Sequence, residues 1–516
     1  MRHRGWISVT VVLGFAAAGC GSSASGVRIS RSDARDLSTV DTAEPTDTTD
    51  APDTTDAPDT TEAPVTTDGP VTTDAPPASM DLPTMMDVPG TDIPLDGPYP
   101  YDADKPAQPF DGLMVATVTD LEQYWADTMP QVFGIDYVPL AGGIFPAYPA
   151  RTEYPPNGCF SSYVDVQDNG FYCPDGDFIT WDDPGYALDN YTDHGSGAIT
   201  GLMSHEWGHA IQARTGVFDI VPEVSTPVVE LQADCYSGAW FGHIARGESD
   251  LLSFTDADVR SGLLDTALSA DPVGSSPTDE GAHGAGFDRV GAFQDGFNLG
   301  ATQCATYVEN NPPITEFGFD ESYDADDDPG DLPYDELLTL IPDDLNTFWT
   351  ATLPDSFRPL TIATFTGTPP ACDGLSAEAI AQSLAIYCPA DGTVLVNDDA
   401  ARVDVDRIGD FSAGYFLASA WAEAAQTSVD SRLDGVKRVL YDDCFVGVWA
   451  KSLPITDDNS GRLVLSPGDL DEAVATAIQF ADNSAADDVL GAAFEKVDAF
   501  RHGALGGISG CNDYFS

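Results

Sequence analysis

The sequence predicts an α+β fold in which helices dominate, on three observations. Residues 198–214 have the pattern of one long helix that Gly216 ends, and Thr226 with Pro227 opens another as an N-cap and a first helical residue. Thr255 and Ser466, each an N-cap candidate with an acid three residues on, mark the starts of two further helices. Strand-like stretches are short, as at 178–181 and 394–396. The same landmarks return in order in two halves of the chain, which predicts one helix-rich domain duplicated in tandem.

Composition and charge restrict the class of protein. The chain has 516 residues, with 85 Asp and Glu against 21 Lys and Arg, and a formal net charge of −64. Such a surface repels the phosphate backbone, so nucleic acid is excluded as a partner. A hydrophobic content of 42% excludes disorder of the whole chain. We therefore expect several folded domains with a strongly acidic exterior.

The first residues, 1–20, have the pattern of a bacterial lipoprotein signal peptide. Arg2 and Arg4 precede an apolar run at 6–18, which is too short to span a bilayer comfortably. Small residues then precede Cys20, which would become the lipidated first residue. We expect an extracytoplasmic protein, lipid-anchored to the bacterial cell membrane. An ordinary signal peptide cut nearby, and hence secretion, is the alternative.

A linker rich in Thr, Asp and Pro follows over residues 21–107. It offers few large apolar side chains to offset the loss of chain entropy, and its prolines and like charges extend it. The sequence therefore predicts a disordered linker. It is either a stalk that holds the folded part away from the membrane or a spacer without a specific role.

The rest of the chain repeats itself. The matching segments are 120–125 and 344–349, 172–174 and 387–389, 234–240 and 443–449, and 287–293 and 494–500. Because their order is kept, we expect two homologous domains at 108–312 and 336–516, joined by an acidic linker at 313–335.

The cysteines follow the same repeat. Apart from Cys20, the chain has four in each copy, and an even number in an exported chain is typical of disulfides. The simplest repeated pairing is Cys159–Cys173 with Cys235–Cys304, and Cys372–Cys388 with Cys444–Cys511. A four-cysteine metal site in each copy is the alternative, which the absence of closely spaced Cys-x-x-Cys pairs disfavours.

The first copy contains an H-E-x-x-H motif on a predicted helix: His205, Glu206 and His209. Residues four apart share a helical face, so both imidazoles can bind one Zn²⁺ while Glu206 lies beside it. Two surface histidines on an ordinary helix are the alternative. Histidine is rare here, with 7 in the chain, which favours the metal site.

A catalytic zinc usually takes three protein ligands and keeps one position open. Glu230 lies on the helix opened by Thr226, and Asp234 lies one turn further on the same face. We expect Glu230 to be the third ligand and Asp234 to accept the free N–H of a ligating histidine. This arrangement on two helices is that of the gluzincins.

These motifs resemble the bacterial putative neutral zinc metallopeptidase family. The matching residues are 171–174, 205–212, 230–235, His283, Gly284, Arg289 and Cys304. The resemblance covers the first copy and implies a zincin-like metallopeptidase domain with one Zn²⁺ and peptide or protein substrates. It implies hydrolysis by a zinc-activated water, with Glu206 as general base. We expect His283 to stabilise the oxyanion, with Arg289 as the alternative.

The second copy lacks these functional residues. The aligned positions are Ser419 for His205, Ala420 for Glu206, Glu423 for His209, Val439 for Glu230 and Leu490 for His283. We expect a similar fold without zinc or activity, which binds substrate, supports the first copy or has no role. The acidic loop at 324–328 is either a solvated linker or a Ca²⁺ site, and its spacing favours the linker.

The leading hypothesis is thus a membrane-tethered zinc peptidase. A non-catalytic cell-surface binding protein with a relic zinc site is the alternative, and a structural protein of the cell envelope is a third. The intact Glu206 favours the enzyme, because a structural zinc needs no base.

Overall fold

The computed structural model describes residues 97–99, 101–155, 159–220, 224–278, 281–312, 314–315, 332–429, 431–433, 435–455, 462–481 and 492–515. The predicted signal peptide with Cys20, most of the linker at 21–107 and most of the acidic linker at 313–335 lie outside these residues. We call the described residues up to 315 the N-terminal region and those from 332 onward the C-terminal region.

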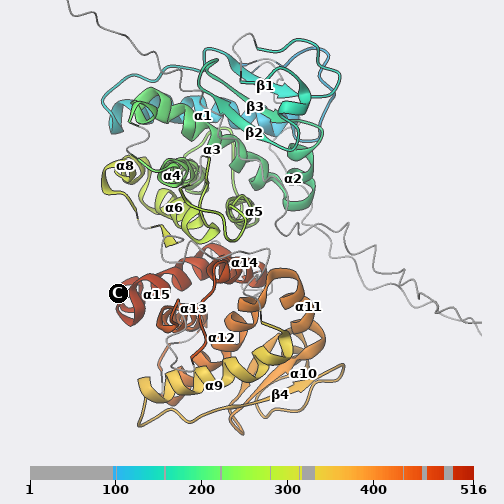
Figure 1. Ribbon diagram of the computed structural model, residues 1–516, viewed down its shortest axis with the longest axis vertical. Coiled ribbons are helices and arrows are strands. Elements are labelled where there is room, and N and C mark those ends of the chain that lie inside the picture. The colour runs from blue at the N-terminus through green and yellow to red at the C-terminus, as the bar shows by residue number, and fades with distance from the viewer. Residues whose placement is uncertain are drawn as a thin grey trace, which may run out of the picture. The chain divides into compact units, whose positions relative to one another are not determined.

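The N-terminal region combines helices with one small sheet (Figure 1). Its helices are α1 (Asp111–Val132), α2 (Tyr186–His194), α3 (Ser196–Thr215), α4 (Thr226–Ala245), α5 (Asp256–Leu268), α6 (Gly286–Leu299), α7 (Ala301–Cys304) and α8 (Tyr307–Asn310), and its strands are β1 (Gly143–Ala147), β2 (Gly170–Cys173) and β3 (Phe178–Asp182). The helix α3 is buried from Gly197 to Gln212 and packs against α1, α2, α4 and α5. It is the central element of this region, as its largely apolar sequence requires.

The sheet of the N-terminal region has the strand order β1-β3-β2. In the middle strand β3, Ile179 pairs with Ile144 of the parallel β1 and with Tyr172 of the antiparallel β2. The strand β2 therefore lies at an edge of the sheet, and α3 packs against it. This packing brings the backbone of β2 next to the H-E-x-x-H motif.

The C-terminal region has the same order of main elements. Its helices are α9 (Tyr334–Thr352), α10 (Ala377–Gln382), α11 (Asp398–Ile408), α12 (Asp410–Ser428), α13 (Gly435–Ser452), α14 (Asp469–Phe480) and α15 (Ala492–Tyr514), and its strands are β4 (Thr361–Phe365), β5 (Ala385–Cys388) and β6 (Thr393–Asn397). The sheet order β4-β6-β5, with one parallel and one antiparallel pair, matches that of β1-β3-β2. The predicted helix-rich α+β class is confirmed.

One buried contact recurs at aligned positions of the two regions. The indole Nε1 of Trp240 donates to Asp120 Oδ1 at 2.8 Å. The indole Nε1 of Trp449 donates to Asp344 Oδ1 at 2.9 Å. Each bond joins the long first helix of its region, α1 or α9, to the helix after the motif position, α4 or α13. The recurrence supports the predicted duplication.

Most helix ends follow the predicted signals. Gly216 ends α3 in the left-handed conformation, at φ 78°, which glycine adopts without strain. Pro227 lies in the first turn of α4, as predicted, but the N-cap of α4 is Ser225 and not Thr226. Thr255 with Asp258 forms a capping box at the start of α5.

The predicted N-cap at Ser466 is wrong. The helix α14 begins at Asp469, and its N-cap is Gly468 at φ 97°. The Ser466 hydroxyl donates to Asp469 Oδ1 at 2.6 Å, so the two side chains pair across a turn that precedes the helix. The serine and the acid three residues on thus bond to each other, but the helix begins at the acid and not directly after the serine.

Four disulfides occur among the described residues. They are Cys159–Cys173, Cys235–Cys304, Cys372–Cys388 and Cys444–Cys511, which are the pairs that the repeat predicts. The pair Cys235–Cys304 joins α4 to α7, and Cys444–Cys511 joins α13 to α15.

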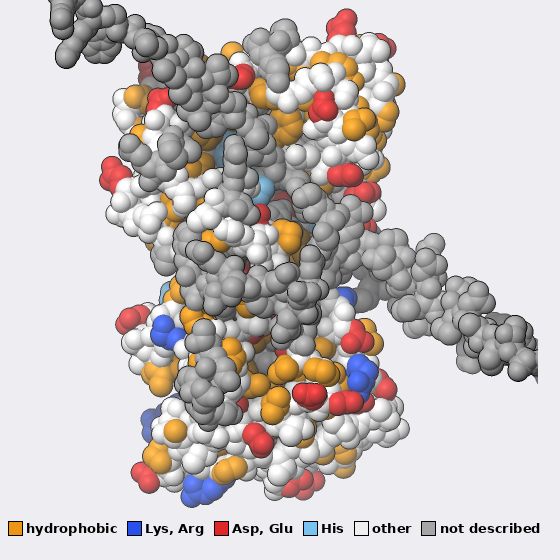
Figure 2. All heavy atoms as spheres, viewed as in Figure 1, with side chains coloured by type: hydrophobic (Ala, Val, Ile, Leu, Met, Phe, Trp, Pro, Cys, Tyr) orange, Lys and Arg blue, Asp and Glu red, His pale blue; other side chains and the backbone are white. Residues whose placement is uncertain are grey.

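None of the described helices has both the length and the apolar composition that crossing a bilayer requires. Acidic side chains are scattered over the face shown in Figure 2 and are not gathered in one patch. This distribution keeps like charges apart, which limits their mutual repulsion.

Candidate metal centre

Close packing of α3 on α4 builds the centre. At Gly208 of α3, an added Cβ would lie 2.9 Å from the Cα of Ala233 in α4, which is closer than ordinary contact allows. The absence of a side chain therefore lets the two helix backbones approach. Gly208 stands between His205 and His209 in the sequence of α3. The close approach of the two helices at this residue therefore sets the distance from the imidazoles to the acids of α4.

Three donor atoms converge between these helices. Glu230 Oε2 lies 3.2 Å from His205 Nε2 and 3.3 Å from His209 Nε2, and the three side chains are nearly inaccessible to solvent. Zinc–ligand bonds of about 2.0–2.1 Å in tetrahedral geometry separate two donors by about 3.3 Å. Both distances match this spacing, so the predicted ligands His205, His209 and Glu230 fit one Zn²⁺.

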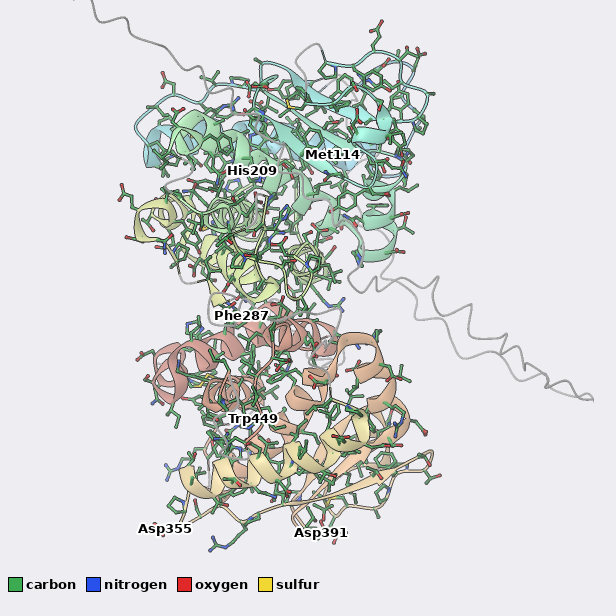
Figure 3. The ribbon with its side chains drawn as sticks, in the orientation of Figure 1. Met114, His209, Phe287, Asp355, Asp391 and Trp449 are labelled. Atoms are coloured by element: carbon green, nitrogen blue, oxygen red, sulfur yellow. A yellow bond between two sulfur atoms is a disulfide. The ribbon has the colours of Figure 1, made fainter. Side chains whose placement is uncertain are left out.

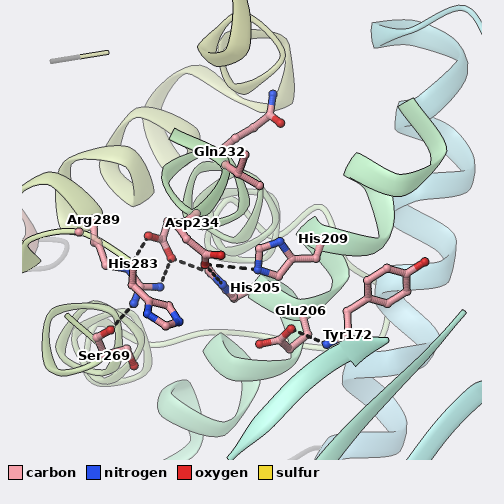
Figure 4. Close-up of polar contacts among 12 residues, drawn as sticks. Tyr172, His205, Glu206, His209, Gln232, Asp234, Ser269, His283 and Arg289 are labelled. Carbon is pink, nitrogen blue, oxygen red and sulfur yellow. Dashed lines mark hydrogen bonds and ion pairs between the residues drawn. The ribbon is translucent and has the colours of Figure 1, made fainter. Parts of the chain in front are cut away.

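A buried chain of polar contacts fixes the ring of His205 (Figure 4). His205 Nδ1 lies 2.7 Å from Asp234 Oδ1, as the sequence predicts. Asp234 in turn accepts bonds from Arg289 Nε at 2.8 Å and Arg289 Nη2 at 2.9 Å. With Nδ1 facing a carboxylate, the ring keeps its Nε2 directed toward Glu230.

A second chain, which the sequence did not reveal, fixes His209. Its Nδ1 lies 2.8 Å from Gln212 Oε1, and the Gln212 amide donates to the backbone oxygen of Val229 at 2.6 Å. The same amide lies 3.1 Å from Gln232 Oε1, and Gln232 donates to the Cys304 carbonyl at 3.0 Å. The signal available in the sequence was the i, i+3 spacing of His209 and Gln212 on one helix.

Glu206 is fully buried and faces the edge strand of the sheet. Its Oε2 accepts the backbone N–H of Tyr172 in β2 at 2.7 Å. This bond orients one oxygen of the carboxylate. Tyr172 was predicted only as part of a family motif, because a backbone donor leaves no residue-type signal.

His283 lies in the loop before α6 and is held by Asp271. The Asp271 carboxylate accepts the backbone N–H groups of His283 at 2.7 Å and Gly284 at 2.8 Å, and it lies 3.2 Å from His283 Nδ1. Gly284 has φ +97°, a conformation that suits glycine alone. Figure 4 draws His283 among the residues of the centre.

Arg289, the alternative candidate for the oxyanion, is directed away from such a role. It is buried, and beyond its two bonds to Asp234 its Nη1 donates to the Ser269 carbonyl. These contacts occupy the guanidinium with Asp234 and the end of α5 (Figure 4). Arg289 therefore positions Asp234.

The charges of the centre stabilise its two carboxylates in the ionised form. Burial alone would raise the pKa of Glu230, but the imidazoles of His209 and His205 outweigh burial and hold that pKa well below its usual range. Burial likewise opposes ionisation of Asp234, and Arg289 and His205 reverse the effect and lower the pKa of Asp234. An ionised carboxylate is the form that binds a cation.

The aligned positions of the C-terminal region form an ion pair in place of donors. Arg438 Nη2 lies 2.9 Å from Glu423 Oε1, at the position of His209. Asp443 and Lys496 lie 2.8 Å apart and occupy the positions of Asp234 and Arg289. The outer salt bridge is thus retained, whereas Ser419, Ala420, Glu423 and Val439 are not part of any group of metal donors among the described residues. Leu490, opposite His283, lies outside these residues.

The packed helices α3 and α4 bring the two histidines of an H-E-x-x-H motif and the downstream Glu230 to one point. This is the donor arrangement of zinc metallopeptidases. Residues 160–307 match the sequence model of the family described as putative neutral zinc metallopeptidase. This match confirms the resemblance that the motifs indicated, and its segment contains every residue of the centre. No curated protein and no solved structure gave a match to the chain.

Proposed function

We propose that the protein is a zinc-dependent peptidase that hydrolyses peptide bonds in a peptide or protein substrate. The convergence of His205, His209 and Glu230 within bonding distance of one ion carries this proposal. A bound Zn²⁺ supplies Lewis-acid polarisation of a carbonyl group and lowers the pKa of a coordinated water.

Glu206 acts as the general base. Its buried carboxylate follows His205 on α3, and the Tyr172 N–H holds Oε2 in place. The carboxylate accepts a proton from the attacking water and delivers it to the leaving amine. The site therefore has both the ligands and the base, and a metal site of purely structural role has no use for the base.

His283 is the candidate donor to the oxyanion. Asp271 fixes both its backbone and its Nδ1, and an imidazole oriented in this way can stabilise negative charge on a substrate oxygen. Arg289 does not take this role, because its nitrogens bond to Asp234 and to Ser269.

We further propose the domain and anchoring plan that the sequence predicts. Lipidation at Cys20 would tether a peptidase domain at 108–312, with the degenerate domain at 336–516 following it. The sequence pattern alone supports this part of the proposal. Replacing Cys20 by Ser should release the protein from the membrane fraction of a bacterial host, whereas an unchanged membrane fraction would contradict lipid anchoring.

The test of the enzyme is Glu206→Gln in the full-length protein. We expect about 10²–10⁴-fold slower hydrolysis of an unstructured protein such as casein, with zinc content unchanged, because the base is lost and the ligands are kept. Glu248→Gln, at an exposed glutamate, is the matched control and should retain full activity. Zinc binding without hydrolysis of any peptide would favour a non-catalytic binding protein.

A further inference from the structure

A carboxylate from the C-terminal region caps a helix of the metal centre. Asp471 of α14 accepts the backbone N–H of Gly286 at 3.0 Å and that of Phe287 at 2.8 Å, which are the first two residues of α6. The N-cap residue of α6 itself, Ala285, provides no side-chain cap. The side chain that caps the start of α6 therefore comes from a residue 185 positions away in the chain.

Helix α6, which Asp471 caps, carries Arg289, the residue that orients Asp234. Arg289 lies in the first turn of α6, and it pairs with Asp234, which contacts His205. The backbone of α6 thus sets the position of the guanidinium. Asp471 is therefore connected to the predicted zinc ligand His205 through the first turn of α6 and through the contacts of Arg289 with Asp234 and of Asp234 with His205.

The surrounding contacts between the two regions are self-complementary. The amide of Gln294 in α6 donates to the Phe494 carbonyl at 2.9 Å, and Arg501 Nε in α15 donates to the Phe287 carbonyl at 3.1 Å. Gln294 aligns with Arg501, and Phe287 aligns with Phe494. Each region therefore makes the same contact to the other, as the two subunits of a symmetric dimer do.

Aromatic packing makes this contact a buried one. The rings of Phe287 and Phe500 meet edge to face, with centroids 6.1 Å apart, and those of Phe297 and Phe494 lie 4.6 Å apart. Phe287, labelled in Figure 3, is fully buried although it lies in the first turn of α6. The start of α6 is thus enclosed between the two regions.

Holding the N-terminal and C-terminal regions together does not by itself explain a carboxylate at this position, because burying a carboxylate costs free energy. Asp471 is half-buried as a residue, yet burial still raises the pKa of its carboxyl, and the two backbone N–H groups only partly offset the effect. An apolar side chain would pack there at lower cost. Gly286 also keeps the start of α6 close to α5, because an added Cβ would lie 3.0 Å from the Ala267 carbonyl oxygen.

We propose that the C-terminal region is a built-in partner that positions the zinc centre. In this arrangement Asp471 fixes the start of α6, and Arg289 and Asp234 transmit that position to the ring of His205. Asp471 is a positioning residue that contacts neither metal nor substrate. The inference rests on the proposed zinc centre and assigns a role to the C-terminal region, whose positions aligned with the predicted ligands form no group of metal donors among the described residues.

The test compares two Asp→Asn substitutions in the full-length protein, at the half-buried Asp471 and at the buried Asp404. Asp471→Asn removes the charge of the cap. Asp404→Asn is the matched control, because Asp404 contacts Arg407 and Gln479 within the C-terminal region. Loss of an outer partner of a metal ligand costs about 10–100-fold in metal affinity. Because Asp471 acts one step further out, we expect about threefold to tenfold weaker zinc binding for Asp471→Asn, measured by competition with a chromophoric chelator, and no change for Asp404→Asn.

Two further readouts separate positioning from general loss of stability. The visible absorption of the Co²⁺-substituted protein, which reports ligand geometry, should shift in Asp471→Asn and not in Asp404→Asn. In the Arg289→Lys background, Asp471→Asn should cost less than about twofold in zinc affinity, because the path is already broken. Asp471→Ser, which keeps one acceptor oxygen, replaces Asp471→Asn if that variant does not fold.

Equal zinc affinity in the wild type and Asp471→Asn, equal losses in the two Asn variants, or additive losses with Arg289→Lys would overturn the inference. A wild type that binds zinc without cutting peptides would refute the proposed peptidase and still allow Asp471 to be judged by zinc affinity. A wild type that binds no zinc would contradict both.

Discussion

At the residue scale, the Nδ1 atoms of the two histidines of the centre contact different kinds of partner. His205 faces the carboxylate of Asp234, whereas His209 faces the amide oxygen of Gln212. Both partners fix the ring tautomer, because an oxygen atom next to Nδ1 requires a proton there. The two partners differ in charge, so they tune the basicity of the two ligands differently.

The Gln212→Ala variant should bind zinc about 10–100-fold more weakly, because the His209 ring loses the contact that orients it. Competition with a chelator of known affinity measures this change. Gln426→Ala is the control, since Gln426 is the aligned residue of the C-terminal region and contacts Asp442 and the Arg438 carbonyl. A Gln212→Ala variant with wild-type affinity would show that His209 needs no such orientation.

A pH dependence of stability should come from Asp288, beside Arg289. Burial and, to a smaller extent, the charge of Asp471 raise the pKa of Asp288 to about 6, against the opposing bonds from Thr315 and the charge of Arg501. A carboxyl with a raised pKa binds more protons in the folded state than in the unfolded state. Its contribution therefore lowers the free energy of unfolding as pH rises from about 4 to 6.

The Asp288→Asn variant should lose this dependence and gain roughly 1–3 kcal/mol in free energy of unfolding at pH 7 relative to the wild type. Asn keeps an oxygen that can accept the Thr315 N–H, which Asp288 accepts at 2.7 Å. Urea unfolding at several pH values measures the slope. An identical slope in the variant and the wild type would show that another group is responsible.

The ligands and the base follow from residue type and spacing, so the sequence could predict His205, Glu206, His209 and Glu230. The hydrogen bond that orients Glu206 could not be predicted, because its donor is the backbone N–H of Tyr172. Every residue except proline carries that group. Sequence also left the role of Arg289 open. Only its direction toward Asp234 distinguishes positioning from contact with an oxyanion.

At the scale of elements, the distance between α3 and α4 determines whether the donors meet. At Gly208 an added Cβ would lie 2.9 Å from the Cα of Ala233. Because this neighbour is a backbone atom, it cannot move aside as a flexible side chain could. Both helices are buried over most of their length, so a change at this point affects neighbours on all sides.

The Gly208→Ala variant should separate α3 from α4, lower the melting temperature and weaken zinc binding by at least about tenfold. Gly414→Ala in α12 is the control, because its Cβ would meet only ordinary contacts at 3.4 Å. In a helix interior that change should be neutral or stabilise by about 0.5–1 kcal/mol. Wild-type zinc affinity in Gly208→Ala would contradict the role given to this contact.

Element ends were predicted well where capping residues marked them, as at Gly216 and Pro227. The strand β1 was not predicted, because it contains Gly143 and Pro146, which are rare inside strands. Its parallel pairing with β3 joins Ile144 to Ile179. Local sequence does not specify which of several short segments pair, so the sheet order was beyond prediction.

At the scale of the whole molecule, the repeated landmarks and cysteines were visible in the sequence because aligned residues recur. The four disulfides lie at the repeated positions. The contact of Asp471 with α6 was not visible, because it joins residues about 185 positions apart and has no counterpart in any motif. The structure thus assigns a role to the C-terminal region through a contact that only folding reveals.

Counting the zinc bound by each chain tests the central claim most directly. Elemental analysis of the full-length protein should find one zinc in the wild type, close to none in the double variant His205→Ala with His209→Ala, and one in the double variant Ser419→Ala with Glu423→Ala. Two zinc ions per chain in the wild type, or zinc retained after both histidines are removed, would contradict a single centre on α3 and α4.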